Sequence, residues 1–304
     1  MRITSNMTSD LALYNLQQEQ VKLNKLQEQA SSQVQINRPS DDPIGARLLT
    51  DIGDKIKAGD QYASNITKTS TWLQTTSTAL DGMAGFMEQA KKLAASITAG
   101  STDPSVGQTV ISQLQSLKQQ LVDMGNTQYG DQYVFGGTNN QKPFSYTSNS
   151  YQGNENTLSV EIGQGATQQM NITGNQLLTG SSTATPANPT PYGTTNILQT
   201  IDNLITDIGA NNVSGIKADS QAIEAGATQI TNAQTDVAAR LLRLNNATTL
   251  NTNTKNTLET IAGNVQYVDL AQVGVELTQQ QTSYQASLSA TAKISQMSLL
   301  DYLK

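Results

Sequence analysis

The feature that most constrains the fold is a seven-residue apolar repeat in the last third of the chain. Its members are Ile216, Ile223, Ile230, Val237, Leu244, Leu258 and Val265. This spacing is typical of helices that pack as coiled coils. Asn251 occupies the one missing point of the repeat, where it either fixes the register of helix pairing or faces solvent. No proline follows Pro191, so the pattern predicts one long helix, or a nearly unbroken pair, reaching the C-terminus.

The N-terminal region carries a matching apolar stripe. Leu16, Leu23, Leu26 and Ala30 recur at helical spacing and predict a helix over about 8–35. We expect Leu11, Tyr14 and Val21 to widen the same face. A helix-breaking stretch follows at 37–43, since Pro39 and Pro43 each remove a backbone donor. Periodicity then predicts a helix over about 44–99 and, after a break at 100–104, a second helix through Met124.

The middle of the chain has a different character. Six of the 14 aromatic residues lie between 129 and 151 together with Gly130, Gly136 and Gly137, and the segments 157–162 and 168–172 resemble short strands. Residues 181–195 are a predicted linker, and helical periodicity resumes near Ile197. The predicted fold is therefore mainly α with a small β insert: an elongated helical rod whose terminal helices form a coiled coil, with a β-rich outer domain.

Composition excludes several classes of function. The sequence has no Cys and no His, which removes thiol chemistry, disulfides and imidazole metal ligands. Its net charge is −6 and its basic residues are scattered, so we expect no nucleic-acid partner. No apolar run is as long as a membrane span, and the first ten residues lack the core of a cleavable signal. We expect a non-enzymatic protein with no cofactor, no metal and no membrane partner.

Single residues that could suggest chemistry have simpler interpretations. Asp41 and Asp42 precede a helix start, where capping is favoured over a catalytic pair, and Arg38 could pair with one of them. Gly136–Gly137 fits a tight turn. We expect Trp72 to pack within the helical part, and we interpret the glycosylation-like patterns at Asn65 and Asn171 as chance. Four helix carboxylates are predicted to be solvated: Asp202, Asp207, Asp219 and Glu224.

Amphipathic helices must bury their apolar stripes in some partner. Periodicity alone leaves open whether these helices form a bundle within one chain or pack between subunits. The modest apolar faces of the Gln- and Asn-rich ends favour packing between subunits, because such helices are marginal on their own.

Four segments of the sequence resemble the bacterial flagellin superfamily and, within it, the hook–filament junction proteins. They are the start MRITSNM at 1–7, the turn RPSDDPIGA at 38–46, the stretch GDQYVFGGT at 130–138 followed by Pro143–Phe144, and the tail SQMSLLDYL at 295–303. The prolines of the turn and the tail are closer to junction proteins than to flagellin, which usually has an Ala-rich turn.

The resemblance implies a structural adaptor that joins hook to filament and is secreted through the flagellar export apparatus to an extracellular position in the flagellum. It implies an inner coiled-coil domain (1–40 plus 265–304), a helical rod domain (41–129 plus 196–264) and a β-rich outer domain with linker (130–195). Expected partners are further copies of the chain, a neighbouring hook-associated protein, flagellin, and an export chaperone on the C-terminal helix. The predicted assembly contacts are Leu16, Leu23, Leu26, Arg38, Asp41, Asp42, Leu277, Tyr284, Leu288 and Ile294.

Two other functions are compatible with the pattern. A short flagellin that forms the bulk of the filament is the nearer alternative, and a coiled-coil tip protein of an export system is the more distant one. A flagellin-like peptidase is excluded, because its zinc-binding His-Glu-x-x-His helix needs histidine.

Overall fold

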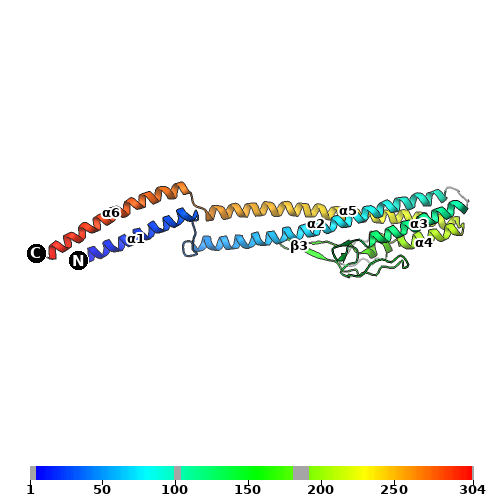
Figure 1. Cartoon of the computed structure of the whole chain (residues 1–304), viewed down its shortest axis with the longest axis horizontal. Coiled ribbons are helices and arrows are strands. Elements are labelled where there is room, and N and C mark those ends of the chain that lie inside the picture. Colours follow the sequence, from blue (N-terminus) through cyan, green and yellow to red (C-terminus); the bar gives the residue numbers. More distant parts are fainter. Residues whose placement is uncertain (1–4, 99–103, 181–191, 303–304) are drawn as a thin grey trace. The chain divides into compact units, whose positions relative to one another are not determined.

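The structure is a computed structural model that describes residues 5–98, 104–180 and 192–302. It is mainly helical with a small strand-containing insert, which confirms the predicted fold class (Figure 1). The helices are α1 (Ser5–Ser32), α2 (Pro43–Thr98), α3 (Pro104–Gly125), α4 (Ile197–Gly209), α5 (Val213–Gln266) and α6 (Leu270–Tyr302).

The contacts divide the chain into two compact units. The terminal unit contains residues 1–58 and 253–304, and the central unit contains residues 59–252. Helices α2 and α5 contribute to both units. The three-domain division inferred from the sequence stays a prediction; by packing, the segment predicted as an outer domain belongs to the same compact unit as the helices around it.

The terminal unit is built on one helix pair. Helix α1 packs against α6, and the two lie side by side with opposite chain directions (Figure 1). The C-terminal helical region is a pair of helices, because the chain breaks at 267–269 between α5 and α6. Asp269 stabilises the new start, since its Oδ1 accepts hydrogen bonds from the backbone N–H groups of Ala271 and Gln272 at 2.9 and 3.3 Å.

The central unit has the continuous hydrophobic core. Buried side chains from α2, α3, α4, α5 and the insert form a single cluster. The five heptad residues of α5 from Ile216 to Leu244 are all buried in it, as their spacing predicts. Trp72 is only 2% exposed and packs edge-on against Tyr129, which confirms that it belongs to the helical core.

The insert contains less β structure than the sequence suggested. Two antiparallel ribbons are present in the described residues: β1 (Gln128–Tyr129) with β2 (Gln132–Tyr133), and β3 (Ser159–Gly163) with β4 (Ala166–Gln169). A π-helical turn, η1 (Asn175–Thr179), follows. Gly137 has a φ of 72°, which confirms the predicted tight turn.

Buried amides explain why so much of the insert is irregular. Asn126 exchanges two 3.0 Å hydrogen bonds with the backbone of Phe144, and Asn171 accepts from the N–H of Leu158 at 2.7 Å and donates to the carbonyl of Asn156 at 2.9 Å. Because these side chains satisfy backbone groups that strands would otherwise pair, the predicted β-rich unit is largely a loop structure pinned by asparagines.

Candidate functional site

The seam between α1 and α6 is the first element of the candidate assembly site. In α1 one row of half-buried positions contains Ala12, Leu16, Glu19, Leu23, Leu26 and Ala30, with Gln29 beside it; in α6 the less exposed positions are Val273, Leu277, Gln280, Tyr284, Ser287 and Thr291. Both sets alternate in steps of four and three, which is the spacing of a coiled-coil seam. The predicted residues Leu16, Leu23, Leu26, Leu277 and Tyr284 therefore lie in this intrachain seam. Their contact with other subunits stays a prediction.

A polar layer crosses the seam near its middle. The Nε2 group of Gln280 donates to the carboxylate of Glu19 and, at 3.3 Å, to its backbone carbonyl. A polar pair at a seam position costs stability compared with an apolar pair, but it disfavours shifted registers, in which it would lose its partner. This layer fixes which turn of α1 faces which turn of α6.

One predicted contact residue does not lie in the seam, and another lies outside the described side chains. Leu288 is 43% exposed, because Ser287 takes the seam position beside it. Ile294 lies within α6, but its side chain is outside the described part of the structure. Both stay predictions as assembly contacts.

Leu11, Tyr14 and Val21 do not widen the seam as the sequence suggested. They are exposed by 52%, 59% and 62%, and Met7 by 54%. On a helical projection these four residues lie on the face of α1 opposite the seam. Helix α1 thus has two apolar stripes, of which only one is covered within the chain.

The turn between α1 and α2 is tied to the break between α5 and α6. Val34 and Tyr267 form an antiparallel bridge, in which the N–H of Gln35 donates to the carbonyl of Gln266 at 2.7 Å. Gln33 has a φ of 60°, which turns the chain out of α1 earlier than the predicted end at residue 35. Backbone hydrogen bonds therefore hold the turn after α1 beside the break between α5 and α6.

The charged residues of the turn have structural partners. Asp42 caps α2, since its Oδ1 accepts from the N–H groups of Ile44 and Gly45 at 3.1 and 3.0 Å, as predicted. Arg38 does not pair with either aspartate; its guanidinium lies 3.4 Å from Glu28 of α1. Asp41 instead pairs with Lys25 at 3.3 Å.

Asp41 is also held in its charged form. A hydrogen bond from the backbone N–H of Arg38, at 3.0 Å, lowers the pKa of the Asp41 carboxyl, and Lys25 lowers it further. The turn thus folds back on the last turns of α1 through two ion pairs. Subunit contact at Arg38, Asp41 and Asp42 stays a prediction, because the structure holds one copy of the chain.

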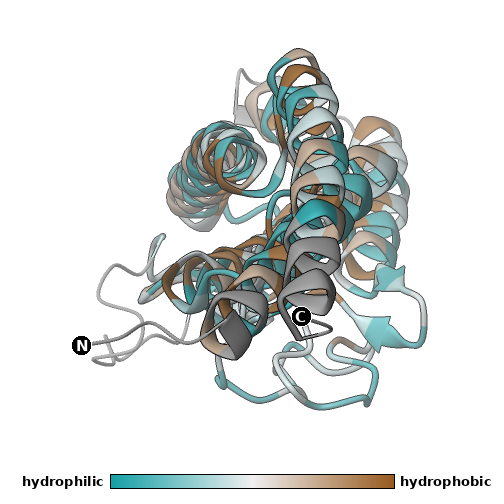
Figure 2. Cartoon of the chain, turned by 90° about the vertical axis from the view of Figure 1, so that its left-hand side faces the viewer, coloured by the Kyte–Doolittle hydropathy of each residue, from teal (hydrophilic) through white to brown (hydrophobic). Residues whose placement is uncertain are grey.

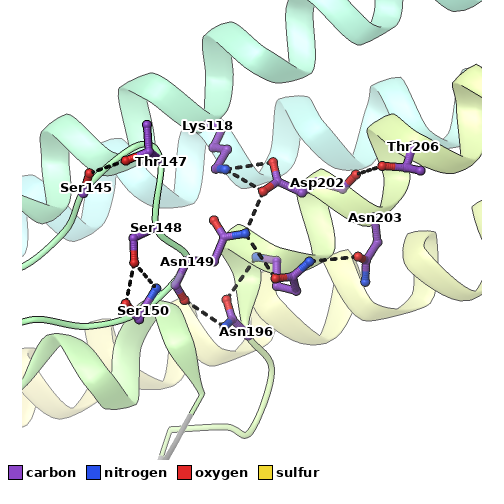
Figure 3. A network of polar contacts seen from close by, with 11 residues as sticks. Lys118, Ser145, Thr147, Ser148, Asn149, Ser150, Asn196, Asp202, Asn203 and Thr206 are labelled. Carbon is purple, nitrogen blue, oxygen red and sulfur yellow. Dashed lines mark hydrogen bonds and ion pairs between the residues drawn. The ribbon is translucent and has the colours of Figure 1, made fainter.

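A second polar network lies in the central unit and fixes the insert to the helices (Figure 3). Lys118 of α3, 4% exposed, places its Nζ 2.7 and 2.8 Å from the carboxylate oxygens of Asp202 in α4 and 5.0 Å from the centre of the Tyr146 ring. Asn149 of the insert donates to the same carboxylate at 2.6 Å, and Asn196 donates to the carbonyl of Asn149 at 3.1 Å. The insert is therefore part of the packed unit.

The edges of the β3–β4 ribbon are also covered by helices. Asn65 of α2 donates to the carbonyl of Glu161 in β3 at 2.8 Å. Arg240 of α5, held by Asp236 at 2.7 Å, donates to the carbonyl of Asn171 just beyond β4 at 3.0 Å. These contacts occupy backbone acceptors that an exposed ribbon edge would otherwise offer to a foreign strand.

The prediction that four helix carboxylates are solvated is wrong for Asp202, Asp207 and Asp219, which are half-buried, and is confirmed for Glu224, which is exposed. Asp202 pairs with the buried Lys118, and Glu224 pairs with Lys91 at 2.9 Å, which raises the pKa of Lys91. Burial raises the pKa of Asp219 to about 6, and the neighbouring carboxylate of Asp207 contributes to this rise. Helical periodicity shows that these residues lie off the apolar rows, but it cannot show which side chains of other helices lie beside them.

The structure decides the role of Asn251, which the sequence left open, and gives structural partners to Asn65 and Asn171. Asn251 donates to the carbonyl of Gly59 at 2.8 Å across the α5–α2 contact, so it acts within the helix pairing and does not simply face solvent. Asn171 is fully buried and Asn65 is bound to Glu161, so both glycosylation-like patterns serve packing.

The described residues contain no group of three or more His, Cys, Asp or Glu side chains that could hold a metal ion. Within the same residues, no helix combines the length and apolar character needed to cross a bilayer. The helices carry alternating hydrophobic and hydrophilic stretches (Figure 2). The terminal unit contributes most of the exposed large hydrophobic side chains, and among its described residues only Ile52 and Val273 are fully buried hydrophobics.

Both ends of the chain match regions of a known protein family. Residues 3–140 match the bacterial flagellin N-terminal helical region, and residues 220–303 match the bacterial flagellin C-terminal helical region. The chain is 25% identical over 227 residues to flagellar hook-associated protein 3 of Salmonella typhimurium, covering 72% of this chain and 71% of that protein.

Solved structures share the fold. A flagellar hook-associated protein from Vibrio parahaemolyticus aligns with a TM-score of 0.65 at 22% identity, over 75% of this chain and 100% of the other. The junction protein FlgL of Legionella pneumophila aligns with a TM-score of 0.58 at 14% identity, over 74% and 100%. The two flagellin helical regions together cover more than half of the residues, so the chain belongs to the bacterial flagellin family. Within this family it is similar to the hook-associated proteins.

Proposed function

We propose that this chain is a structural adaptor subunit of the bacterial flagellum that joins hook to filament and assembles through α1 and α6. One observation carries the proposal. The terminal unit, which contains the two flagellin-like chain ends, has most of the exposed large apolar side chains, whereas the central unit has the continuous buried core.

The physical reason is the free energy of the exposed stripe. Each large apolar side chain left in water forgoes roughly 1.5–3 kcal/mol of burial free energy. Met7, Leu11, Tyr14 and Val21 stand together on one helix face, and a contiguous patch of this kind marks an interaction site. A subunit that is stable through its central unit and completed by neighbours at its terminal unit fits an assembly protein.

The adaptor role implies a route and partners. The chain would leave the cell through the flagellar export channel and contact a neighbouring hook-associated protein on one side and flagellin on the other. An export chaperone would cover the C-terminal helix before secretion. The absence of Cys supports this route, since folding after export needs no oxidation step.

A short flagellin is the second candidate, because the family matches are to flagellin regions. Copy number separates the two roles. A bulk filament subunit would dominate the protein of purified flagella, whereas an adaptor would be a minor component. An export-system tip protein has less support, because it would not be expected to carry both flagellin helical regions.

Deletion of the gene tests the proposal directly. We expect mutant cells to keep hooks, to lack attached filaments and to release flagellin monomers into the medium, and the wild-type gene to restore filaments. Electron microscopy and immunoblots of the medium measure both effects. Filaments that form normally in the deletion strain would refute the adaptor role.

A further inference from the structure

The side chain of Lys118 is enclosed, although it ends in an amine. Lys118 is the only buried lysine of the described residues, with 4% of its surface exposed. Leu114 and Leu121, one turn away in α3, are fully buried, and the ring centre of Tyr146 lies 5.0 Å from the Nζ atom of Lys118. An enclosed lysine can act as a nucleophile when a neighbouring group accepts its proton, because only the neutral amine has a free electron pair. The neighbours of this Nζ atom therefore decide what it can do.

Asn149 of the insert holds its amide in one orientation near this amine (Figure 3). Its Nδ2 group donates to Oδ2 of Asp202 at 2.6 Å and to Oε1 of Gln199 at 3.2 Å, and these two acceptors fix which end of the amide is nitrogen. Its Oδ1 atom is buried and has no hydrogen-bond partner within the described part of the chain. Leaving a buried carbonyl oxygen unpaired costs free energy, and a chemical role of the group is one explanation of such a cost.

One oxygen of Asp202 contacts both nitrogens. Oδ2 lies 2.7 Å from Nζ of Lys118 and 2.6 Å from Nδ2 of Asn149. A carboxylate at hydrogen-bond distance from an amine and from an amide nitrogen can accept a proton from the first and give it to the second. The three side chains come from α3, the insert and α4, which share one packed core. Holding reacting groups together in this way raises their effective concentration.

We propose that Lys118 and Asn149 become joined by an isopeptide bond, with Asp202 as the group that carries the proton. Asp202 takes a proton from the Lys118 ammonium, and the neutral Nζ attacks the Cγ atom of Asn149. The Cγ–Nδ2 bond then breaks. Over the whole step Nζ gives up two protons through the carboxylate, and Nδ2 leaves with both as an ammonium ion. One C–N bond forms and one breaks, so the step needs no oxidant, reductant or co-reactant.

The amide of Asn149 is a better target for Lys118 than the carboxylate of Asp202. A carboxylate anion repels the electron pair of an attacking amine, whereas a neutral amide does not, and Asp202 is needed as the base. The side chain of Asp202 is 36% exposed, so water stabilises its charged form and the neutral pair is a minor species. We therefore expect the freshly folded protein to hold the ion pair and the isopeptide bond to accumulate slowly.

The bond gives the central unit a covalent cross-link without cysteine. The chain has no Cys, so no disulfide can hold the insert to the helices. An amide link between residues 118 and 149 closes a loop that contains the end of α3 and the first part of the insert, and such a cross-link limits the freedom of the unfolded chain. Because all three groups lie in the central unit, the bond does not depend on the adaptor role.

Mass spectrometry of the purified full-length chain tests the bond. The chain is kept folded at physiological temperature, and samples taken over several days are weighed intact and digested with chymotrypsin. We expect the intact mass to fall by that of one ammonia molecule, and a branched peptide to join residues around Lys118 to residues around Asn149. Lys118→Arg is the matched control, because it keeps a cation beside Asp202 but has no nucleophilic amine. Asp202→Asn removes the proton acceptor and should slow the reaction at least about a hundredfold.

Absence of the branched peptide from the folded wild type would overturn the proposal. An equal rate in Asp202→Asn, or a loss of water that joins Lys118 to Asp202, would also overturn it. Loss of ammonia within an unbranched peptide would indicate a succinimide at Asn149 and would equally contradict the bond.

Wild-type chain kept in urea is the control that needs no variant to fold. Unfolding separates the three groups, so we expect no branched peptide in urea, and its formation there at the same rate would show that the folded cluster is not responsible. Fluorescence of Trp72 in the central unit shows whether each variant is folded.

Discussion

The two units of this chain differ in how completely they bury their apolar side chains. The central unit brings α2, α3, α4, α5 and the insert around one continuous core. The terminal unit contains the α1–α6 helix pair and the adjoining ends of α2 and α5, and the seam residues of the pair are mostly half-buried and include a polar layer. One unit is complete within the chain, and the other leaves apolar surface for a neighbour.

This difference fits the proposed role of an assembly subunit. A central unit with a complete core of its own can fold without contacts from a second subunit. A terminal unit that is only marginally stable by itself stays open to other subunits, because most of its apolar surface is buried only when it contacts them. The ion pairs at Lys25 and Glu28 tie the turn after α1 to the last turns of that helix.

Hydrogen exchange on the free monomer is the largest expected difference between the units. We expect amides in α1 before about Asn37 and in α6 after about Val268 to exchange at least about a thousandfold faster than those at Leu73–Leu80 of α2, because local opening of the terminal unit costs far less than global unfolding. Mass spectrometry of peptides from both regions measures this. Equal protection in a verified monomer would refute the assembly role of the terminal unit.

Truncation of one leucine in each unit gives the next largest effect. Leu114 is fully buried in α3, so Leu114→Ala should lower the free energy of unfolding of the central unit by about 3 kcal/mol. Leu16→Ala, at a half-buried seam position, should leave that transition unchanged. Urea unfolding followed by the fluorescence of Trp72, the chain's single Trp, reports on the central unit. A comparable loss from Leu16→Ala would mean that the two units unfold as one.

The sequence predicts helices well here because the heptad signal is local. The bounds of α2 and α3, the buried row of α5 and the cap at Asp42 all follow from spacing or from turn chemistry. The polar contacts that hold the insert do not. Lys118 and Asp202 are 84 residues apart, and Arg240 lies 69 residues beyond its acceptor Asn171.

The second stripe of α1 escaped the sequence interpretation for a different reason. Leu11, Tyr14 and Val21 lie close to the seam residues in sequence, and a broad apolar face and two opposite stripes differ only in angle around the helix. The sequence interpretation identified the apolar seam residues of α1 but not the polar seam members Glu19 and Gln280, which complete the seam. A heptad assignment that accepts polar seam positions would have separated the two rows.

Loss of the buried Lys118 tests whether the insert stabilises the central unit. Lys118→Met keeps most of the side-chain volume but leaves the carboxylate of Asp202 without its cation, and we expect a loss of about 2 kcal/mol because Asp202 is partly solvated. Lys92→Met, which removes an exposed helix pair at 3.9 Å, is the matched control and should change the unfolding free energy by less than about 0.5 kcal/mol. Equal effects would mean that the network in Figure 3 does not hold the insert.

The smallest expected effect is a pH dependence confined to the central unit. Burial and Asp207 raise the pKa of Asp219 from its usual 3.8 to about 6, so the folded state binds this proton more tightly than the unfolded state. This group therefore adds stability as the pH falls from above 6 towards 4. Asp219→Asn removes the effect, so the variant should gain on the wild type in urea midpoint at pH 8 and lose that advantage at pH 4.5. Asp41 has a lowered pKa and acts in the opposite sense, but it lies in the terminal unit, where Trp72 does not report. A constant difference between variant and wild type across this range would show that the Asp207–Asp219 pair is not coupled to folding of the central unit.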